Sequence, residues 1–221
     1  MSKIVDLTLP IHEGMTTYPS PWHPPTEISI LGRHHIEGRM TRKLTIGTHS
    51  GTHVDSPLHF IPGATPIDEV PLETLVGRAK LIDMSHKKAR GVITRADLEG
   101  CGVQPQKGDR IVVRTDWSDH IYERDFYQAY PSFSKDALEW LIEKGIIFLA
   151  MDTPSPDGPQ DKLVPGEISP MHYLLMSNGV VVCEYLTDLK KITQPEFTIF
   201  ALPLRIQGSD GAAARVVAIL D

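Results

Sequence analysis

Apolar residues recur along the chain at two different spacings, and each spacing predicts one type of element. In residues 40–48, Met40, Leu44 and Ile46 share one face and alternate with polar positions, which predicts a strand. In residues 134–144 apolar residues recur at helical spacing behind Ser134, which suits a helix N-cap, and before Gly145, which suits a helix stop. Strands and helices are therefore mixed along the chain, as in an α/β fold.

The same criteria predict the remaining elements. Strands are expected at residues 4–9, 26–32, 79–84, 109–115, 146–151, 180–183, 197–202 and 214–220, and shorter helices at residues 71–75, from residue 94 and at 169–178. A length of 221 residues, of which 41% are hydrophobic, is enough for one sizeable core. We expect a single α/β domain that spans residues 1–221.

Charge and cysteine content narrow the class of protein. The formal net charge is −6 and there is no basic run, which argues against a nucleic-acid or anionic-membrane partner and favours a small-molecule substrate. Only Cys101 and Cys183 are present, and residues 1–6 lack the pattern of a signal peptide. No apolar run approaches the ~20 residues of a membrane span. We expect a cytoplasmic protein with reduced thiols.

One stretch, His49–Phe60, carries the candidate chemistry. It holds His49, His53, Asp55 and His59, three histidines and one aspartate within eleven residues. Imidazole with carboxylate is the ligand chemistry of zinc, manganese or ferrous iron, whereas calcium and magnesium prefer oxygen ligands. An extended chain would spread these side chains over about 30 Å. The chain must therefore turn, and Gly51 and Pro57 are residues that permit a turn.

An exposed polar loop is the alternative interpretation of this stretch. The residues that flank it argue against that, because they are apolar and place the stretch against a core. They are Leu44, Ile46, Leu58, Phe60 and Ile61. Buried ionisable groups need a partner or an ion, and a metal would supply one.

Two further ligand candidates lie late in the chain. Ser169 and Pro170 form a helix start, which places His172 in the first helical turn. Glu184 directly follows the strand predicted at residues 180–183. A cluster of carboxylates and hydroxyls at residues 152–157 also follows a predicted strand, although turn chemistry alone would explain it.

Aromatic residues are the candidates for a substrate pocket. Tyr18 and Trp22 lie in a proline-rich loop, residues 10–25, which either covers a pocket or covers a sheet edge. Trp117 follows the carboxyl end of a predicted strand, where pockets lie in α/β proteins, and Phe60 adjoins the metal stretch. These rings could stack on a planar substrate.

The stretch from His49 to Phe60 resembles the H-x-G-T-H-x-D-x-P-x-H-F signature of the cyclase family of metal-dependent hydrolases, which includes kynurenine formamidases and isatin hydrolases. Further segments agree in order along nearly the whole chain. They are Arg114, Thr115 and Trp117, residues 152–157, and residues 208–211 with Arg215.

The resemblance implies a swivelling β/β/α domain with a mixed sheet and flanking helices, assembled as a homodimer or tetramer. It implies two divalent ions, zinc or manganese. Position by position, His49, His53 and Asp55 would bind one ion and Asp55 and His172 a second, with Glu184 bridging both. His59 matches the general acid/base residue of the family. The implied activity is hydrolysis of a C–N bond in an aryl formamide or a cyclic amide.

Several alternatives stay open. Kynurenine formamidases carry Trp-Pro-Gly-Asp in the N-terminal loop where this chain has Tyr18 to Pro21, so a lactone, ester or isatin-type substrate is the second interpretation. His53, Asp55 and His172 also fit the two-histidine, one-carboxylate triad of a mononuclear ferrous oxygenase. A metal-stabilised binding protein is the third alternative interpretation. Residues 208–211 lack a G-x-S-x-G elbow, which argues against a covalent serine mechanism.

Overall fold

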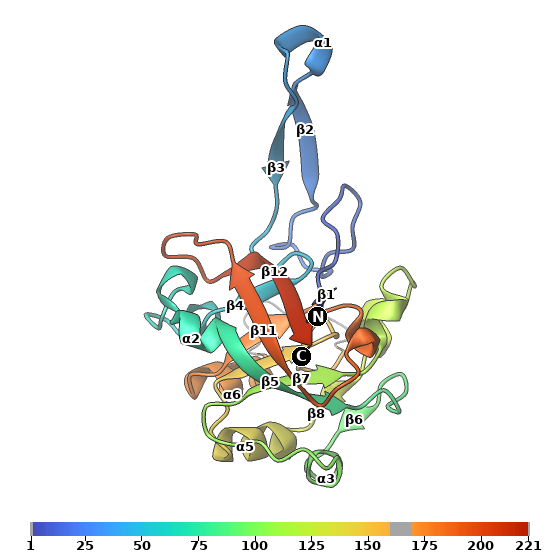
Figure 1. Ribbon diagram of the computed structural model, residues 1–221, viewed down its shortest axis with the longest axis vertical. Coiled ribbons are helices and arrows are strands. Elements are labelled where there is room, and N and C mark those ends of the chain that lie inside the picture. Colours follow the sequence, from blue (N-terminus) through green and yellow to red (C-terminus); the bar gives the residue numbers. More distant parts are fainter. Residues whose placement is uncertain (1, 160–168, 221) are drawn as a thin grey trace.

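The computed structural model describes residues 2–159 and 169–220, and within them eight strands form one mixed sheet that curls until it closes. The strand order is β1-β12-β11-β5-β7-β9-β10-β4, and β12 also pairs with β4. The long β12 makes this closure possible, because Gly211 to Ala213 pair with β4 and the rest of the strand pairs with β1 and β11 (Figure 1). The bounds are β1 Lys3–Asp6, β4 His53–Asp55, β5 Val76–Asp83, β7 Arg110–Arg114, β9 Phe148–Met151, β10 Val181–Glu184, β11 Glu196–Pro203 and β12 Gly211–Leu220.

Two hydrophobic cores lie on opposite sides of this sheet. Alternate residues of β9 show the division: Phe148 and Ala150 belong to the core inside the curled sheet, and Leu149 and Met151 to the core under the helices. Successive side chains of a strand point to opposite faces, so a strand buried on both faces reads as a continuous apolar run. This explains why the segment at 146–151 is apolar throughout.

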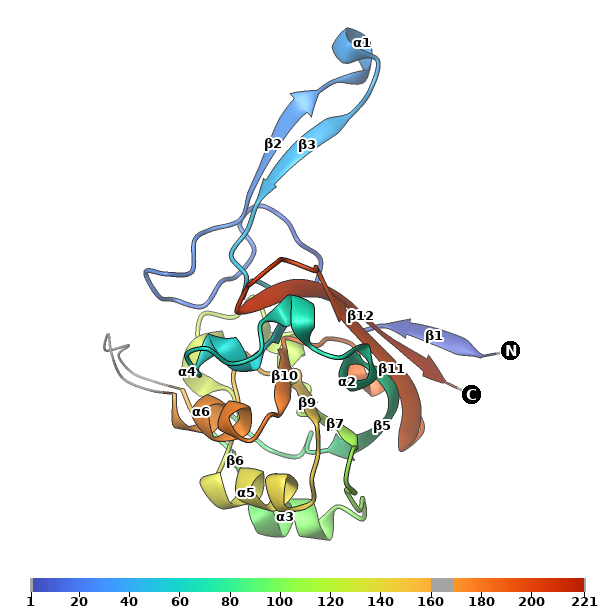
Figure 2. The same cartoon turned by 90° about the vertical axis from the view of Figure 1, so that its left-hand side faces the viewer.

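Helices α3, α5 and α6 cover the outer face of the sheet (Figure 2). Thr94 caps α3 with a complete capping box, as predicted: its hydroxyl accepts from the Asp97 amide, and the Asp97 carboxylate accepts from the Thr94 amide. The helices are α1 His34–Glu37, α2 Leu72–Leu75, α3 Arg95–Gly100, α4 Phe126–Ala129, α5 Lys135–Glu143 and α6 Pro170–Ser177, and the 3₁₀ turns are η1 Pro57–His59, η2 Ile67–Glu69, η3 Trp117–His120 and η4 Leu189–Lys191. The predicted α/β class with a mixed sheet and flanking helices is confirmed.

Two smaller strand pairs lie outside the main sheet. One pairs β6 (Val92–Ile93) with β8 (Ser132–Phe133) beside α3 and α5. The other pairs β2 (Glu27–Gly32) with β3 (Thr41–Thr45), and this hairpin with α1 at its tip projects from the body as an arm (Figures 1 and 2). The expectation that Leu44 lies against the core is wrong. It lies on β3, in the arm that projects from the body, and is 46% exposed.

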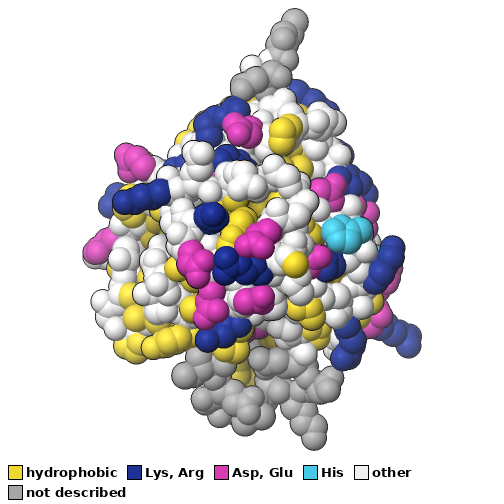
Figure 3. All heavy atoms as spheres, turned by 90° about the horizontal axis from the view of Figure 1, so that it is seen from below, with side chains coloured by type: hydrophobic (Ala, Val, Ile, Leu, Met, Phe, Trp, Pro, Cys, Tyr) yellow, Lys and Arg dark blue, Asp and Glu magenta, His cyan; other side chains and the backbone are white. Residues whose placement is uncertain are grey.

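One face of the body mixes both signs of charge. Seen from below, Lys and Arg side chains alternate with Asp and Glu side chains over one face (Figure 3). Among the described residues, no helix has both the length and the apolar character needed to cross a membrane.

Closure of the sheet yields a first prediction. A Cβ at Gly211 would lie 2.8 Å from His49 Cε1 and 2.9 Å from the Val54 carbonyl oxygen. Gly211→Ala is expected to destabilise the protein by about 1–3 kcal/mol through overpacking, measured by urea unfolding. Gly100→Ala is the control, because its Cβ meets no atom within 4 Å and it should be neutral or stabilising by up to about 1 kcal/mol. Equal effects of the two variants would contradict a tight β4–β12 junction.

Candidate metal centre

The His49–Phe60 stretch turns as its sequence predicts. Gly51 adopts a positive φ of 64°, β4 follows, and Pro57 opens the 3₁₀ turn η1 that ends at His59. The left-handed conformation at Gly51 favours glycine, since a side chain there would be strained. The turn brings His49 back beside Asp55, with its Nδ1 2.6 Å from Asp55 Oδ1.

Strand pairing brings the late carboxylate to the early ligands. In the antiparallel pairing of β4 with β10, Glu184 lies opposite His53, so these side chains share a face with Asp55, two residues along β4. His53 Nε2 lies 3.0 Å from Asp55 Oδ1 and 3.5 Å from Glu184 Oε2. The fold thus joins residues that are far apart in sequence into one buried cluster.

His172 reaches the same cluster from the first turn of α6. Its Nε2 lies 3.0 Å from Glu184 Oε1 and 3.6 Å from Asp55 Oδ2. All five side chains predicted as ligands therefore converge around Asp55, and each is less than 10% exposed. They are His49, His53, Asp55, His172 and Glu184.

Each of the three histidines is oriented by a second acceptor on its other ring nitrogen. His53 Nδ1 lies 2.8 Å from the Gly51 carbonyl oxygen, and His172 Nδ1 lies 2.6 Å from Asp157 Oδ2. His49 Nε2 lies 2.6 Å from Asp210 Oδ2. One nitrogen bound to an acceptor and the other directed at a carboxylate cluster is the arrangement that metal-binding histidines adopt, because it fixes the ring and its tautomer.

Two polar atoms at the centre lack a hydrogen bond. His53 Nε2 and Asp55 Oδ2 are fully buried and have no partner with hydrogen-bond geometry among the described residues. Buried polar atoms without partners are costly, and an ion shared by them would satisfy both. Two sets of ligand atoms within 4.8 Å of one another meet there, His49 with Asp55 and His59, and His53 with Asp55 and Glu184. These residues fit a divalent metal.

The electrostatics of this cluster favour a bound cation. Burial alone would raise the pKa of Asp55, but His53 and His49 lower it well below its usual value. Burial raises the pKa of Glu184 despite its hydrogen bond to His172. Burial would lower the pKa of His49, yet Asp55 and Asp210 raise it to about 10. Burial would also lower the pKa of His172, yet Asp157, Asp55 and Glu184 raise it well above its ordinary value. Protonated His49 and His172 can therefore offset part of the carboxylate charge.

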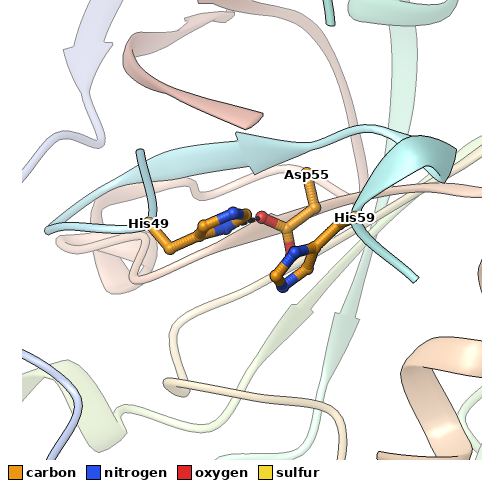
Figure 4. Close-up of side chains that lie close together, drawn as sticks. All are labelled: His49, Asp55 and His59. Atoms are coloured by element: carbon orange, nitrogen blue, oxygen red, sulfur yellow. Dashed lines mark hydrogen bonds and ion pairs between the residues drawn. The ribbon is translucent and has the colours of Figure 1, made fainter. Parts of the chain in front are cut away.

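His59 lies close to His49 and Asp55 (Figure 4). Its ring stacks on that of His49 with centroids 3.8 Å apart, its Nδ1 is 3.3 Å from Asp210 Oδ2, and its side chain is 25% exposed. Burial lowers the pKa of His59, and Asp210 and Asp55 offset this only partly. A neutral, partly accessible imidazole suits proton transfer, although its position beside Asp55 also suits a ligand.

The predicted pocket aromatics occupy different places. Phe60 stacks on His172 with ring centroids 4.9 Å apart, and Tyr18 packs edge-on against Tyr127 with centroids 5.3 Å apart. Trp117 is buried, donates its indole N–H to the Phe126 carbonyl and packs among aromatic residues behind the centre. Trp22 is 56% exposed. Phe60 therefore lies beside the candidate metal centre, whereas Trp117 belongs to a buried aromatic cluster.

Asp157, Asp210 and His23 were not assigned roles from the sequence. The first two lie in turns, where aspartate is common for local reasons, and only the fold shows that they orient the candidate ligands His172 and His49. In the sequence, the indication of a role for Asp157 and Asp210 is that they lie in the segments 152–157 and 208–211, which resemble the family. The His23 ring lies 6.1 Å from that of His49, and burial with the neighbouring histidines lowers its pKa to about 4, so it is a neutral group in the loop beside Tyr18.

Comparison with known proteins agrees with this geometry. Residues 5–158 match the family model described as "Putative cyclase". The chain belongs to the cyclase family. Kynurenine formamidase of Bacillus cereus is 27% identical over 98% of this chain and 97% of its own length. Isatin hydrolase A from Ralstonia solanacearum has a TM-score of 0.89 at 26% identity and covers 100% of this chain and 92% of its own.

A second solved structure is described as a predicted metal-dependent hydrolase from Bacillus stearothermophilus. It is 28% identical, has a TM-score of 0.78 and covers 99% of this cyclase-family chain and 98% of its own. The chain is therefore an enzyme of the cyclase family, as its sequence predicts. The same similarity argues against the ferrous oxygenase and the binding protein.

The raised pKa of His49 predicts how metal affinity depends on pH. Histidine binds a cation only as the neutral ring, so binding must displace the His49 ring proton that faces Asp55. The affinity of metal-free enzyme for Zn²⁺ should rise about tenfold per pH unit for each displaced proton between pH 7 and 9. Competition with a chromophoric chelator at three pH values measures this. Asp210→Asn should flatten the slope, and a pH-independent wild-type affinity would contradict the prediction.

The same proton makes the metal-free fold less stable as the pH rises, whereas the affinity for metal increases. The pKa of His49 is raised above its ordinary value of 6.5, so its contribution stabilises the metal-free fold below pH 6.5. That contribution is lost as the pH rises towards 10.

Proposed function

We propose that this cyclase-family enzyme hydrolyses a C–N bond of a small amide by means of a metal-activated water. The observation that carries the proposal is the convergence of three oriented histidines on Asp55 and Glu184, with two central polar atoms left without hydrogen bonds. Open coordination positions on such a centre distinguish a catalytic site from a closed structural one.

We assign His49, His53 and Asp55 to one divalent ion and Asp55 and His172 to a second, with Glu184 between them. The distances from His172 Nε2 to Glu184 and Asp55 support the second assignment. Zinc and manganese both suit mixed imidazole and carboxylate ligands. When bound, such ions lower the pKa of a coordinated water and polarise a carbonyl.

His59 is the group that we assign to proton transfer. His59 Nδ1 lies 3.3 Å from Asp210 Oδ2, and a proton on Nδ1 leaves Nε2 with the lone pair that can take a proton from the attacking water. The lowered pKa of His59 keeps the ring neutral before the reaction. The protonated ring can then deliver this proton to the leaving nitrogen, so one residue acts first as base and then as acid.

The substrate that we favour is an aryl formamide such as N-formylkynurenine, or a cyclic amide. Phe60 and Tyr18 offer aromatic surface, and curated relatives are named kynurenine formamidase. An isatin-type, lactone or ester substrate is the second candidate, supported by the name of the solved structure with TM-score 0.89 and by the Tyr18 to Pro21 segment. A small-molecule substrate, a cytoplasmic location and a homodimer or tetramer complete the proposal.

A side-by-side assay tests the substrate class. Metal-loaded enzyme is given N-formylkynurenine, isatin and a panel of lactones. The proposal expects kcat/KM for the formamide in the range common for enzymes, about 10⁴–10⁸ M⁻¹s⁻¹. A much lower value beside a rapid isatin or lactone reaction would replace the formamide with the second candidate.

His59→Ala tests the proton-transfer role. We expect turnover to fall about 100-fold or more, because acid–base catalysis is lost, while the metal content measured by elemental analysis is retained. His53→Ala is the matched control and should lose metal as well as activity. Loss of metal in His59→Ala would show that His59 is a ligand, since it lies within ligand distance of His49 and Asp55.

A further inference from the structure

The N-terminal loop, residues 10–25, lies directly on the start of the metal stretch. A Cβ added at Gly51 would lie 2.8 Å from Met15 Cε, and one added at Gly47 would lie 3.2 Å from Pro24 Cδ. These two loop side chains therefore rest against backbone that only glycine leaves open to such close approach. The contacts hold the loop beside the turn that carries the early ligands.

His23 brings a polar side chain from this loop to the metal centre. Its ring centroid lies 6.1 Å from that of His49 and 5.8 Å from that of Tyr18. Its backbone is held in a turn, because the His23 amide donates to the Ser20 carbonyl over 3.2 Å. Prolines at positions 21, 24 and 25 restrict φ around it. The backbone of the loop therefore has little freedom to lose when a ligand contacts this ring.

The ring nitrogens of His23 differ from those of the candidate ligand histidines in having no partner. His49, His53 and His172 each have a carbonyl or carboxylate oxygen within 3.0 Å of both ring nitrogens. Neither ring nitrogen of His23 forms a hydrogen bond or ion pair with a residue that the structure describes, although the side chain is partly buried. Imidazole carries at least one N–H donor in either protonation state. His23 therefore offers an unused donor beside the centre.

Two phenols add further donors on the same side. Burial, Glu184 and Asp157 raise the pKa of Tyr18, so its hydroxyl stays protonated. Burial also raises the pKa of Tyr130, whose hydroxyl is fully buried and has no hydrogen-bond partner among the described residues. A phenol that stays protonated remains a donor. The side of the centre that faces the N-terminal loop therefore suits a ligand with oxygen acceptors.

We propose that His23 is a substrate-binding residue, whose N–H donates a hydrogen bond to a second oxygen acceptor beside the scissile amide. The proposal rests on the amide hydrolysis proposed above and narrows its substrate class. The scissile carbonyl must approach the ligands, and the His23 ring lies 6.1 Å from the His49 ring, so only a few bonds separate that carbonyl from the second acceptor. The substrate class is therefore an aryl formamide with an ortho carbonyl, or a cyclic amide with an adjacent ketone.

Both amides favoured above share this second acceptor. N-formylkynurenine carries a ketone ortho to its formamide, and isatin carries a ketone next to its amide carbonyl. One donor at His23 therefore serves either substrate, whereas a simple anilide or an unsubstituted lactone leaves the donor without an acceptor, which costs binding energy.

Two formanilides that differ only in the second acceptor test the proposal. Metal-loaded wild-type enzyme should show a higher kcat/KM for 2-acetylformanilide than for formanilide. His23→Phe, which keeps an aromatic ring, and His23→Ala both remove the N–H. Each should lower the ratio of the two kcat/KM values about tenfold, through KM. His23→Gln restores an N–H donor and should recover most of the ratio.

His12→Phe, in the same loop, is the matched control. His12 Nδ1 lies 2.8 Å from the Glu13 carbonyl oxygen, at an exposed position, so this variant should keep the wild-type ratio. Metal content measured by elemental analysis should match that of the wild-type enzyme in all four variants.

Binding of the amine products separates this proposal from the proposed reaction, because it needs no turnover. By titration calorimetry, metal-loaded wild-type enzyme should bind 2-aminoacetophenone more tightly than aniline, and His23→Phe should remove most of that difference. This binding pattern in an enzyme that hydrolyses neither formanilide would support the His23 site while contradicting amide hydrolysis. Equal effects of His23→Phe on both members of a pair, or loss of metal from that variant, would overturn the His23 assignment.

Discussion

A carboxylate buried in the protein interior is the constraint on which the rest of the structure depends. Asp55 is 1% exposed, yet its pKa is lowered, so it stays ionised away from water. Burying an ion without a partner costs several kcal/mol. His49, His53 and His172 surround it, and Gly51, Asp157 and Asp210 in turn hold those rings. The cluster therefore needs a cation, whether a proton or a metal, before the fold is electrostatically balanced.

The architecture supplies these partners from two directions. On one side of β4, strand β10 brings Glu184 opposite His53; on the other, the start of β12 packs on β4. The turn before β12 places Asp210, whose backbone oxygen also accepts from the Ser56 amide over 3.0 Å. Closure of the sheet therefore also places Asp210 beside His49 in the candidate metal centre.

The sequence predicted most of the elements because their local signals were strong. The capping box at Thr94, the proline-first start of α6 and the apolar runs at 111–113 and 146–151 each specify structure within a few residues. The five candidate ligands could be predicted because clustered imidazole and carboxylate side chains favour metal binding. What the sequence could not provide was long-range pairing: the double partnership of β12, the arm that exposes Leu44, and the partners that Asp157 and Asp210 find.

The β4–β12 junction also bears on how the enzyme matures. His49 and Asp210 are 161 positions apart, and β12 follows every other strand along the described chain. Contacts between such distant segments form late, since a large loop must close first. During synthesis, the early histidines would leave the ribosome well before the segment that orients one of them. Stable capture of the ion should therefore come as a post-translational event, coupled to the final step of folding.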